Sequence, residues 1–309
     1  MKKLFVLVLL FMASAAQALQ LDTVKVSDGV YALVGELNQR SPENLGLNLT
    51  TGFIVTDQGV IVIDTGGSWL GAQAIHNAIR KVTDKPIKWV INTGGQDHRW
   101  LGNGYFVEQG ATIIAAEAGK KDMIARTAQQ VDMASRWLKD KFEGTHPVYP
   151  GQTFEKRYVM PVKDMRIELI YTGGAHTKGD IFVWLPERAI VFTGDAVFSQ
   201  RLLGIQPGLG LQWIKSLEYM RDTLKPRIVV PGHGMVTDLD TALHDSYDYL
   251  VLLRDYASKK IEEGAFDPVE AINGLDQSRF SYLKQYDQIT FRNRNALTMA
   301  EEIFAKSSR

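Results

Sequence analysis

The sequence predicts an α/β fold in which two mixed β-sheets pack face to face, with helices on their outer sides. Two observations support this prediction. Runs typical of strands fall into two blocks, residues 23–115 and 152–235, and helical spacing lies between the runs of each block. After about residue 238 the pattern is entirely helical, which predicts extra helices at the C-terminal end.

The first block contains five strand-like runs. They are Val30–Val34, Gly52–Thr56, Val60–Asp64, Ile87–Asn92 and Ala111–Ala115. Asp57-Gln58-Gly59 separates the second run from the third and predicts a hairpin whose strands are largely buried. Two apolar stripes at helical spacing accompany these runs, namely Ile75, Ile79 and Val82, and then Ile124, Ala128, Val131 and Leu138.

The second block contains four strand-like runs and is followed by helices. The runs are Arg166–Tyr171, Ile181–Leu185, Ala189–Thr193 and Arg227–Pro231. Apolar stripes predict helices at Trp213, Leu217, Met220 and Leu224, and at Leu239, Leu243, Leu250 and Leu253. A last helix is expected from about Phe291 to Ala305.

The first residues form a separate segment. Two lysines precede an apolar stretch at residues 4–12, and Ala16-Gln17-Ala18 follows as a small-x-small cleavage site. This pattern is typical of a secretory signal peptide and is too short for a membrane-spanning helix. We therefore predict a signal peptide at residues 1–18, export to a bacterial periplasm, and no membrane span in the mature protein.

The rest of the chain is expected to form an α/β domain at 19–238 and a helical extension at 239–309 that packs on it. The full chain has 35 basic and 35 acidic residues, so no basic field indicates nucleic acid as a partner. We expect a small-molecule substrate, and a homodimer is one assembly that the sequence leaves open. The chain has no cysteine, so any metal must be held by His, Asp or Glu.

Candidate polar residues stand where strand-like runs end. Asp64, Asp97, His98, His176, Asp195 and His233 all lie in glycine-rich loops of this kind. Open sheets expose functional side chains at strand ends, and glycine lets such loops approach one another closely. Three histidines and three aspartates without cysteine suit zinc or another divalent metal.

The motifs that contain these residues occur in a characteristic order. They are "IDTGG", "INTGGQDHRWLGN", "GGAHTKGD", "FTGDAVF" and "PGHG". In this order the chain resembles the metallo-β-lactamase superfamily from about Asp22 to Asp238, and most closely its exported quinoprotein relay zinc metallohydrolases. The resemblance implies an αββα sandwich and metal-assisted hydrolysis of amide, ester, thioester, lactone or phosphoester bonds.

One loop departs from the family pattern of Thr-His-x-His-x-Asp-His, two residues and Gly-Asn. Thr93 and Gly102-Asn103 keep the usual mutual spacing. In that register Gly94 and Gln96 take the leading histidine positions, His98 the aspartate position and Arg99 the last histidine position. In the alternative register Asp97-His98 is the Asp-His pair, and Thr93 and Gly95 take the leading positions. Either way, both leading histidines of the first metal position are absent.

A count of ligands therefore predicts one metal ion instead of two. His98, Asp195 and His233 supply three ligands, and Asp97 or His176 is available as a fourth. One zinc ion is the expected cofactor, with another divalent metal as the alternative. We expect Asp97 to orient a water molecule or accept its proton, and Asp64 and Gln96 to hold the ligands or their loop from behind.

Arg99 has two interpretations. It is either a solvated side chain, or a guanidinium that fills the vacated space and takes over part of a metal's electrostatic role in catalysis. The leading functional hypothesis is an exported single-metal hydrolase that acts on a small ester, lactone or related carbonyl compound. The alternatives are a weakly active or inactive accessory protein that serves a periplasmic quinoprotein, such as an alcohol dehydrogenase, and a β-lactamase.

Overall fold

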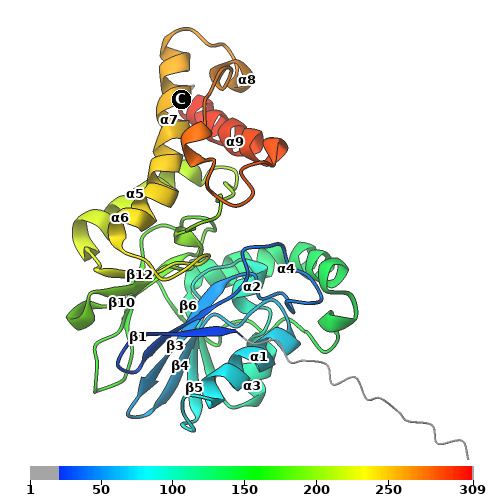
Figure 1. Ribbon diagram of the computed structural model, residues 1–309, viewed down its shortest axis with the longest axis vertical. Helices are drawn as coiled ribbons and strands as arrows, with labels where there is room; N and C mark the ends of the chain where they lie inside the picture. The colour runs from blue at the N-terminus through cyan, green and yellow to red at the C-terminus, as the bar shows by residue number, and fades with distance from the viewer. Residues whose placement is uncertain (1–20, 308–309) are drawn as a thin grey trace, which may run out of the picture.

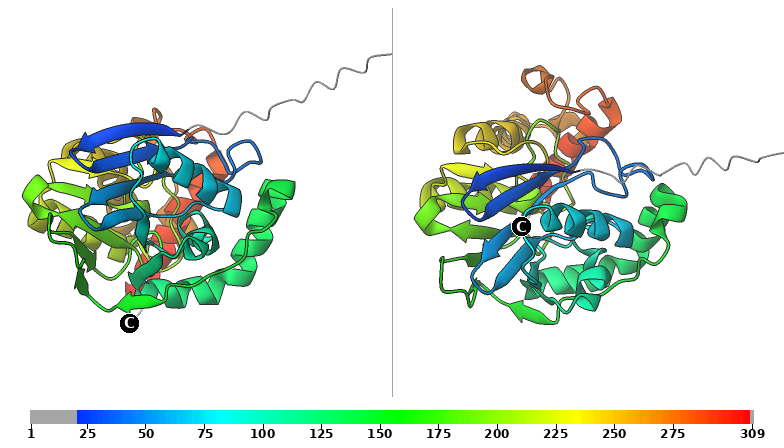
Figure 2. Two further views of the ribbon diagram at one scale, coloured as in Figure 1. Left: turned by 90° about the horizontal axis from the view of Figure 1, so that it is seen from below. Right: turned by 60° about the horizontal axis from the view of Figure 1, so that its bottom comes forward.

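The structure is a computed structural model and describes residues 21–307, so the expected signal peptide lies outside the described residues. Two β-sheets form the centre of the molecule, and helices cover both outer faces (Figure 2). This arrangement is the αββα sandwich that the sequence predicts. The C-terminal helices stand above the sheets in Figure 1.

The first sheet has seven strands in chain order. They are β1 (Asp22–Ser27), β2 (Val30–Val34), β3 (Thr50–Thr56), β4 (Gly59–Ile63), β5 (Ile87–Ile91), β6 (Thr112–Ala116) and β7 (Gln152–Phe154). The pairs from β1 to β4 are antiparallel, and the pairs from β4 to β7 are parallel. The predicted hairpin at Asp57-Gln58-Gly59 is confirmed between β3 and β4.

The second sheet has five strands, ordered β12, β11, β10, β9 and β8. Their bounds are β8 (Arg157–Val159), β9 (Glu168–Tyr171), β10 (Ile181–Leu185), β11 (Ile190–Phe192) and β12 (Ile228–Val230). Only β11 and β12 pair in parallel. The sequence did not predict β1, β7 and β8, because these short or polar runs show little apolar alternation.

Alternating side chains on the strands build three layers of apolar core. On β4, Ile61 and Ile63 face the opposite sheet, while Val60 and Val62 pack against the outer helices. The outer helices of this sheet are α1 (Trp69–Arg80) and α3 (Asn103–Glu108). Because both faces of the strand are buried, its sequence is continuously apolar.

The outer face of the second sheet is covered by the helices that follow it. Phe182 and Trp184 of β10 share one apolar cluster with Trp213, Leu253 and Met299. The helical segments are α5 (Gly210–Tyr219), η4 (Met220–Leu224), α6 (Leu239–Ala242), η5 (Leu243–Tyr247), α7 (Asp248–Glu262), α8 (Pro268–Ala271) and α9 (Ile289–Ser307). The shared cluster means that the C-terminal helices are part of the same core.

Helix α4 (Glu117–Leu138) corrects one expectation. The predicted stripe places Ile124 in the core, but this side chain is 51% exposed. The helix instead buries Met123, Ala134 and the polar Gln130. The reason is local: this face of α4 lies against the loop after β5, where Arg126 and Gln130 donate to the carbonyl of Gly95.

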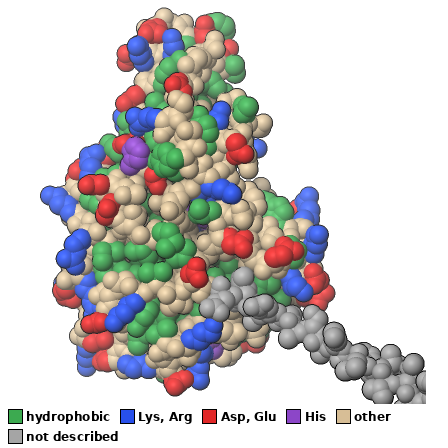
Figure 3. Space-filling model, in the orientation of Figure 1, with side chains coloured by type: hydrophobic (Ala, Val, Ile, Leu, Met, Phe, Trp, Pro, Cys, Tyr) green, Lys and Arg blue, Asp and Glu red, His purple; other side chains and the backbone are tan. Residues whose placement is uncertain are grey.

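The surface carries both signs of charge. Basic and acidic side chains are interspersed over the face shown in Figure 3, as the equal numbers of basic and acidic residues suggest. Among residues 21–307, no helix has the length and apolar character needed to cross a membrane.

Candidate metal centre

The loops after β4, β5, β11 and β12 meet at one edge of the sandwich. Two backbone hydrogen bonds join the sheets there, from Ile181 N to Thr93 O at 2.8 Å and from Thr50 N to Gly232 O at 2.7 Å. The parallel pairs β4–β5 and β11–β12 direct their carboxyl ends to this edge. Side chains from distant parts of the chain can therefore share one site.

Three of the predicted ligands form a compact group. His98 lies on the short helix α2 (Asp97–Trp100), Asp195 on the single turn η3 (Gly194–Ala196), and His233 just after β12. One ligand atom from each lies within 4.8 Å of the other two. His233 Nε2 is 3.1 Å from Asp195 Oδ1, and His98 Nε2 is 3.2 Å from Asp195 Oδ2.

The chemistry of this group fits a divalent metal ion. All three side chains are at most 3% exposed. Oδ2 of Asp195 is buried and has no well-aligned hydrogen bond within residues 21–307. Two imidazoles and a carboxylate with a free oxygen are a typical set of three protein ligands for zinc or a similar ion.

Arg99 is fully buried directly behind this group. Its Nη2 donates to Asp195 Oδ1 at 2.6 Å, and its Nη1 donates to Asp64 Oδ2 at 2.9 Å. The same guanidinium donates to the carbonyls of Thr50 and Gly232. Burial opposes the charge, but the two carboxylates outweigh burial and raise the pKa of Arg99 further. The solvated interpretation of Arg99 is therefore wrong.

Asp64 is bonded to the loop after β5. Its carboxylate accepts from Thr93 N and Thr93 Oγ1, both at 2.7 Å, in addition to Arg99. Asp64 has a φ of 62°, a conformation that aspartate tolerates better than most residues. Burial raises its pKa, and Arg99 and Thr93 oppose that rise.

Asp97 is placed differently from the expectation of a catalytic base. It is fully buried, and its Oδ1 is paired with the guanidinium of Arg40. Burial by itself would raise the pKa of Asp97, but Arg40 and hydrogen bonds from His98 hold it well below its usual range. A carboxylate with so low a pKa is a poor proton acceptor near neutral pH.

Arg40 itself was not predicted. It comes from the irregular segment between β2 and β3, contacts Nδ1 of His98, and lies 5.0 Å from the Trp137 ring centroid. Arg201 makes the equivalent approach to His233, with Nη1 at 3.2 Å from Nδ1. Neither arginine lies in a periodic segment, so the sequence gives no pattern that points to them.

The space of the absent leading histidines is filled by other residues. A Cβ atom on Gly94 would collide with Oδ1 of Asp180, and one on Gly95 would collide with Asp122. The carbonyl of Gly95 accepts from Arg126 at 2.9 Å and from Gln130 at 2.8 Å, both on α4. Residues 93–96 contain no histidine, so this segment offers no imidazole to a first metal position in either register.

Asp180 directly precedes β10 of the second sheet, and its carboxyl group lies against Gly94. Its carboxyl group accepts from Thr177 N at 2.6 Å and contacts Thr177 Oγ1 at 2.5 Å. Burial and the nearby Asp195 raise the pKa of Asp180 to about 8. This residue ends the motif "GGAHTKGD", in which the sequence points only to His176 as a functional side chain.

His176 lies outside the three-residue group. Its Nδ1 is 2.8 Å from the carbonyl oxygen of Gly204, and its ring packs edge-on against Phe198 and Trp213. Burial lowers the pKa of His176 to about 4, so the ring is neutral at pH 7. Its role as a metal ligand stays a prediction.

Gln96 links loops around the centre. Its Nε2 donates to Asp97 Oδ1 at 2.9 Å, while its Oε1 accepts from Arg126 at 3.2 Å and from Gln206 at 3.4 Å. The supporting role of Gln96 at a metal centre stays a prediction. The links also tie α4 and the segment after β11 to the loop that carries His98.

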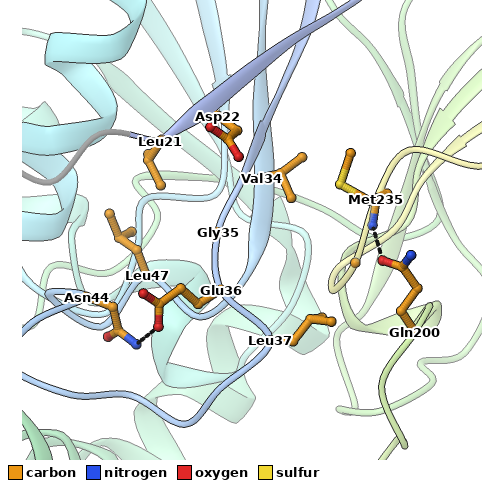
Figure 4. A pocket seen from close by; sticks show the side chains of 11 residues that line it. Leu21, Asp22, Val34, Gly35, Glu36, Leu37, Asn44, Leu47, Gln200 and Met235 are labelled. Atoms are coloured by element: carbon orange, nitrogen blue, oxygen red, sulfur yellow. Dashed lines mark hydrogen bonds between the residues drawn. The ribbon is translucent and has the colours of Figure 1, made fainter. Parts of the chain in front are cut away.

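A groove of about 310 Å³ borders the segments that carry the site. Figure 4 shows Glu36, Asn44 and Leu47 on one side of it, and Gln200 and Met235 on the other. The residues on the first side belong to the irregular segment between β2 and β3, which also contains Arg40. Gln200 precedes Arg201, and Gly234, which also lines the groove, follows His233.

Comparisons with known proteins agree with this geometry. Residues 46–233 match the family model of the metallo-beta-lactamase superfamily. A metallo-beta-lactamase type 2 of Bacillus cereus is 34% identical over 197 residues, which cover 61% of this chain and 68% of that protein.

Two solved structures share the fold at low sequence identity. A metallo-beta-lactamase from Pontibacter korlensis has a TM-score of 0.59 and 20% identity. The match covers 75% of this chain and 99% of that protein. The inverting sec-alkylsulfatase Pisa1 from a Pseudomonas species has a TM-score of 0.69 and 15% identity. The match covers 91% of this chain and 50% of that protein. By its motifs, its fold and these matches, the chain belongs to the metallo-β-lactamase superfamily.

Proposed function

We propose that the protein is an exported hydrolase that uses a single divalent metal ion, with zinc as the first candidate. Membership of the superfamily supports a metal-dependent, hydrolase-like function. The observation that carries the single-ion proposal is the group of His98, Asp195 and His233, together with the absence of any histidine at residues 93–96. The substrate class we propose is a small ester, lactone or related carbonyl compound.

The three residues of the group would hold the ion through two imidazole nitrogens and one carboxylate oxygen. When bound, such an ion acts as a Lewis acid on a carbonyl group and makes water a better nucleophile at neutral pH. Arg99 fixes the orientation of Asp195 through the bond to Oδ1 and does not bond Oδ2, which lies 3.2 Å from His98 Nε2 without an aligned hydrogen bond. Asp64 anchors Thr93 and Arg99, so the loop after β5 is held in place before any substrate arrives.

A test needs metal content and activity from the same preparation. We expect the purified full chain to contain about one metal equivalent and to hydrolyse at least one member of a panel of esters, lactones and β-lactams. The lactams belong in the panel because the Bacillus cereus relative is named a metallo-beta-lactamase. His233→Ala should lose the metal and lower hydrolysis by about 100-fold or more, since even outer partners of a ligand are typically worth about 10- to 100-fold.

The exposed His244 provides the control, because His244→Ala leaves the group intact. Less than half an equivalent of metal, unchanged in His233→Ala, would contradict the proposal.

Export has its own test. The mature protein should be recovered from the periplasmic fraction with its N-terminus near Leu19.

A second candidate is an accessory protein without strong catalytic activity, with a periplasmic quinoprotein as its partner. The observation that favours it is that Asp97 and Asp195 are already paired with Arg40 and Arg99. The charges of the site are therefore compensated without an ion. A metal-free preparation that is fully folded and hydrolyses nothing in the panel would support this candidate over the hydrolase.

A further inference from the structure

The far end of the C-terminal helices carries an exposed apolar patch, formed by Phe266, Val269 and Ile289. These side chains are 80%, 65% and 61% exposed, the highest values among the large hydrophobic residues within 21–307. Phe266 and Val269 line one groove together with Asn293 of α9. Ile289 precedes Asn293 by four residues on the same helix, so the two side chains share a face. The three most exposed apolar side chains therefore gather at one place.

The groove beside this patch is large enough to hold a ligand. Its volume is about 680 Å³, within the usual range for a binding pocket. Ile272 and Leu275 are half-buried and add apolar walls, and both also pack against the core of the second sheet's helices. Single exposed apolar side chains are normal on a protein surface, whereas a contiguous patch marks an interaction site.

The charge of the groove is negative. Asp267 and Glu270 are its only charged lining residues, and neither forms an ion pair within residues 21–307. Backbone groups hold both carboxylates in place: Asp267 Oδ1 accepts from Glu270 N at 2.8 Å, and Glu270 Oε2 accepts from Phe266 N at 2.9 Å. Two fixed negative charges beside apolar walls complement a ligand that is both apolar and positively charged.

The same charges argue against two other occupants. In a symmetric dimer the patch would face its own copy, which would bring Asp267 and Glu270 close to like charges. An anionic membrane surface would be repelled by the same carboxylates. A partner protein whose apolar side chains are flanked by Lys or Arg meets neither difficulty.

We propose that this groove binds a basic amphipathic segment of another protein. The apolar side chains of that segment lie against the apolar patch, and its Lys or Arg side chains pair with Asp267 and Glu270. An amphipathic helix laid into a groove is a common form of such recognition. Figure 1 places α8 at the end of the C-terminal helices, far from α2, which carries His98. Binding there leaves the candidate metal centre uncovered, so this inference does not depend on the proposed hydrolase.

Fluorescence anisotropy of a labelled amphipathic peptide of leucine and lysine, titrated with the full chain, tests the surface. We expect saturable binding, weaker by about tenfold or more for a peptide in which glutamate replaces each lysine. Phe266→Ser should weaken binding by about tenfold or more, since burial of a phenylalanine side chain is worth at least that factor. Glu270→Gln keeps an acceptor for Phe266 N but removes the charge, so it should weaken binding a few-fold, and only at low salt.

Matched changes elsewhere on the surface serve as controls. Ile124→Ser removes an exposed apolar side chain of α4, and Glu143→Gln removes an exposed carboxylate. Both variants should bind the peptide as wild type does. Phe266 packs little against the rest of the protein, so circular dichroism and the melting temperature of Phe266→Ser should match wild type.

No saturable binding of the leucine and lysine peptide, or equal binding by wild type and a folded Phe266→Ser, would overturn the proposal. Tighter binding of the glutamate peptide would overturn it as well. Analytical ultracentrifugation and co-sedimentation with phosphatidylglycerol vesicles test the two other occupants. A wild-type dimer that Phe266→Ser dissociates would assign the patch to a second copy, and vesicle binding lost in Phe266→Ser would assign it to a membrane. Either result would replace the basic protein partner.

Discussion

Nη2 of Arg99 lies 2.6 Å from Oδ1 of Asp195, the carboxylate that both histidines of the candidate metal centre also approach. The arginine is completely buried and its other amino group is bonded to Asp64. A permanent cation is thus bonded to Oδ1 of the carboxylate, and Oδ2 has no aligned hydrogen bond within residues 21–307. These two ion pairs explain how the loop after β5, which lacks the leading histidines, still fixes the positions of Asp64 and Asp195.

Removal of this cation is expected to destabilise the protein. Arg99→Met would leave Asp64 and Asp195 buried without their partner, a loss of about 3–5 kcal/mol for a broken buried pair. Urea unfolding at pH 7 measures it. Arg136→Met removes an exposed arginine and should change the free energy of unfolding only slightly. A similar, slight change for both variants would show that Arg99 is not needed for stability.

Restoration of the leading histidines should not restore a second metal position. In Gly94→His/Gln96→His the new side chain at 94 would collide with Asp180. We expect the metal content, measured by mass spectrometry after zinc loading, to stay at one equivalent, with a lower melting temperature than wild type. Two equivalents in the double variant would mean that the loop after β5 adapts more easily than its packing suggests.

His176 lies outside the group of three and should contribute little to metal affinity. We expect His176→Ala to keep its zinc affinity within a few-fold of wild type in a chelator competition, whereas His233→Ala loses it. The two variants remove the same side chain type, so each is the control for the other. A comparable loss in both would make His176 a ligand.

Asp180 is expected to give stability a distinct dependence on pH. Its pKa is raised to about 8, compared with about 3.9 for an unfolded aspartate, so the folded protein binds an extra proton between these values. Its contribution is therefore complete below about pH 4 and is lost as the pH rises towards 8.

Comparison with Asp180→Asn isolates this contribution, because the amide mimics the protonated acid and does not titrate. Thermal unfolding at several pH values should show wild type losing stability relative to the variant between pH 5 and about pH 8. If wild type gained stability relative to the variant over this pH range, the protonated state of Asp180 would be refuted.

Much of the sandwich was predictable because its strands are buried on both faces. Val60–Ile63 and Ile181–Leu185 are continuous apolar runs, and both are strands at the positions expected. The face of α4 was not predictable in the same way. Ile124 is exposed there, because Gln130 and Arg126 are needed to bond the carbonyl of Gly95.

The sequence by itself determined the sandwich and pointed to His98, Asp195 and His233 as candidate ligands, because strand ends followed by glycine-rich loops are visible as a linear pattern. Only the tertiary structure decided the surroundings of these residues. It paired Asp97 with Arg40, brought Arg201 to His233, and placed Asp180 against Gly94. Such contacts join irregular segments far apart in the chain, where no periodicity constrains the side chains, and they form only once the two sheets have packed together.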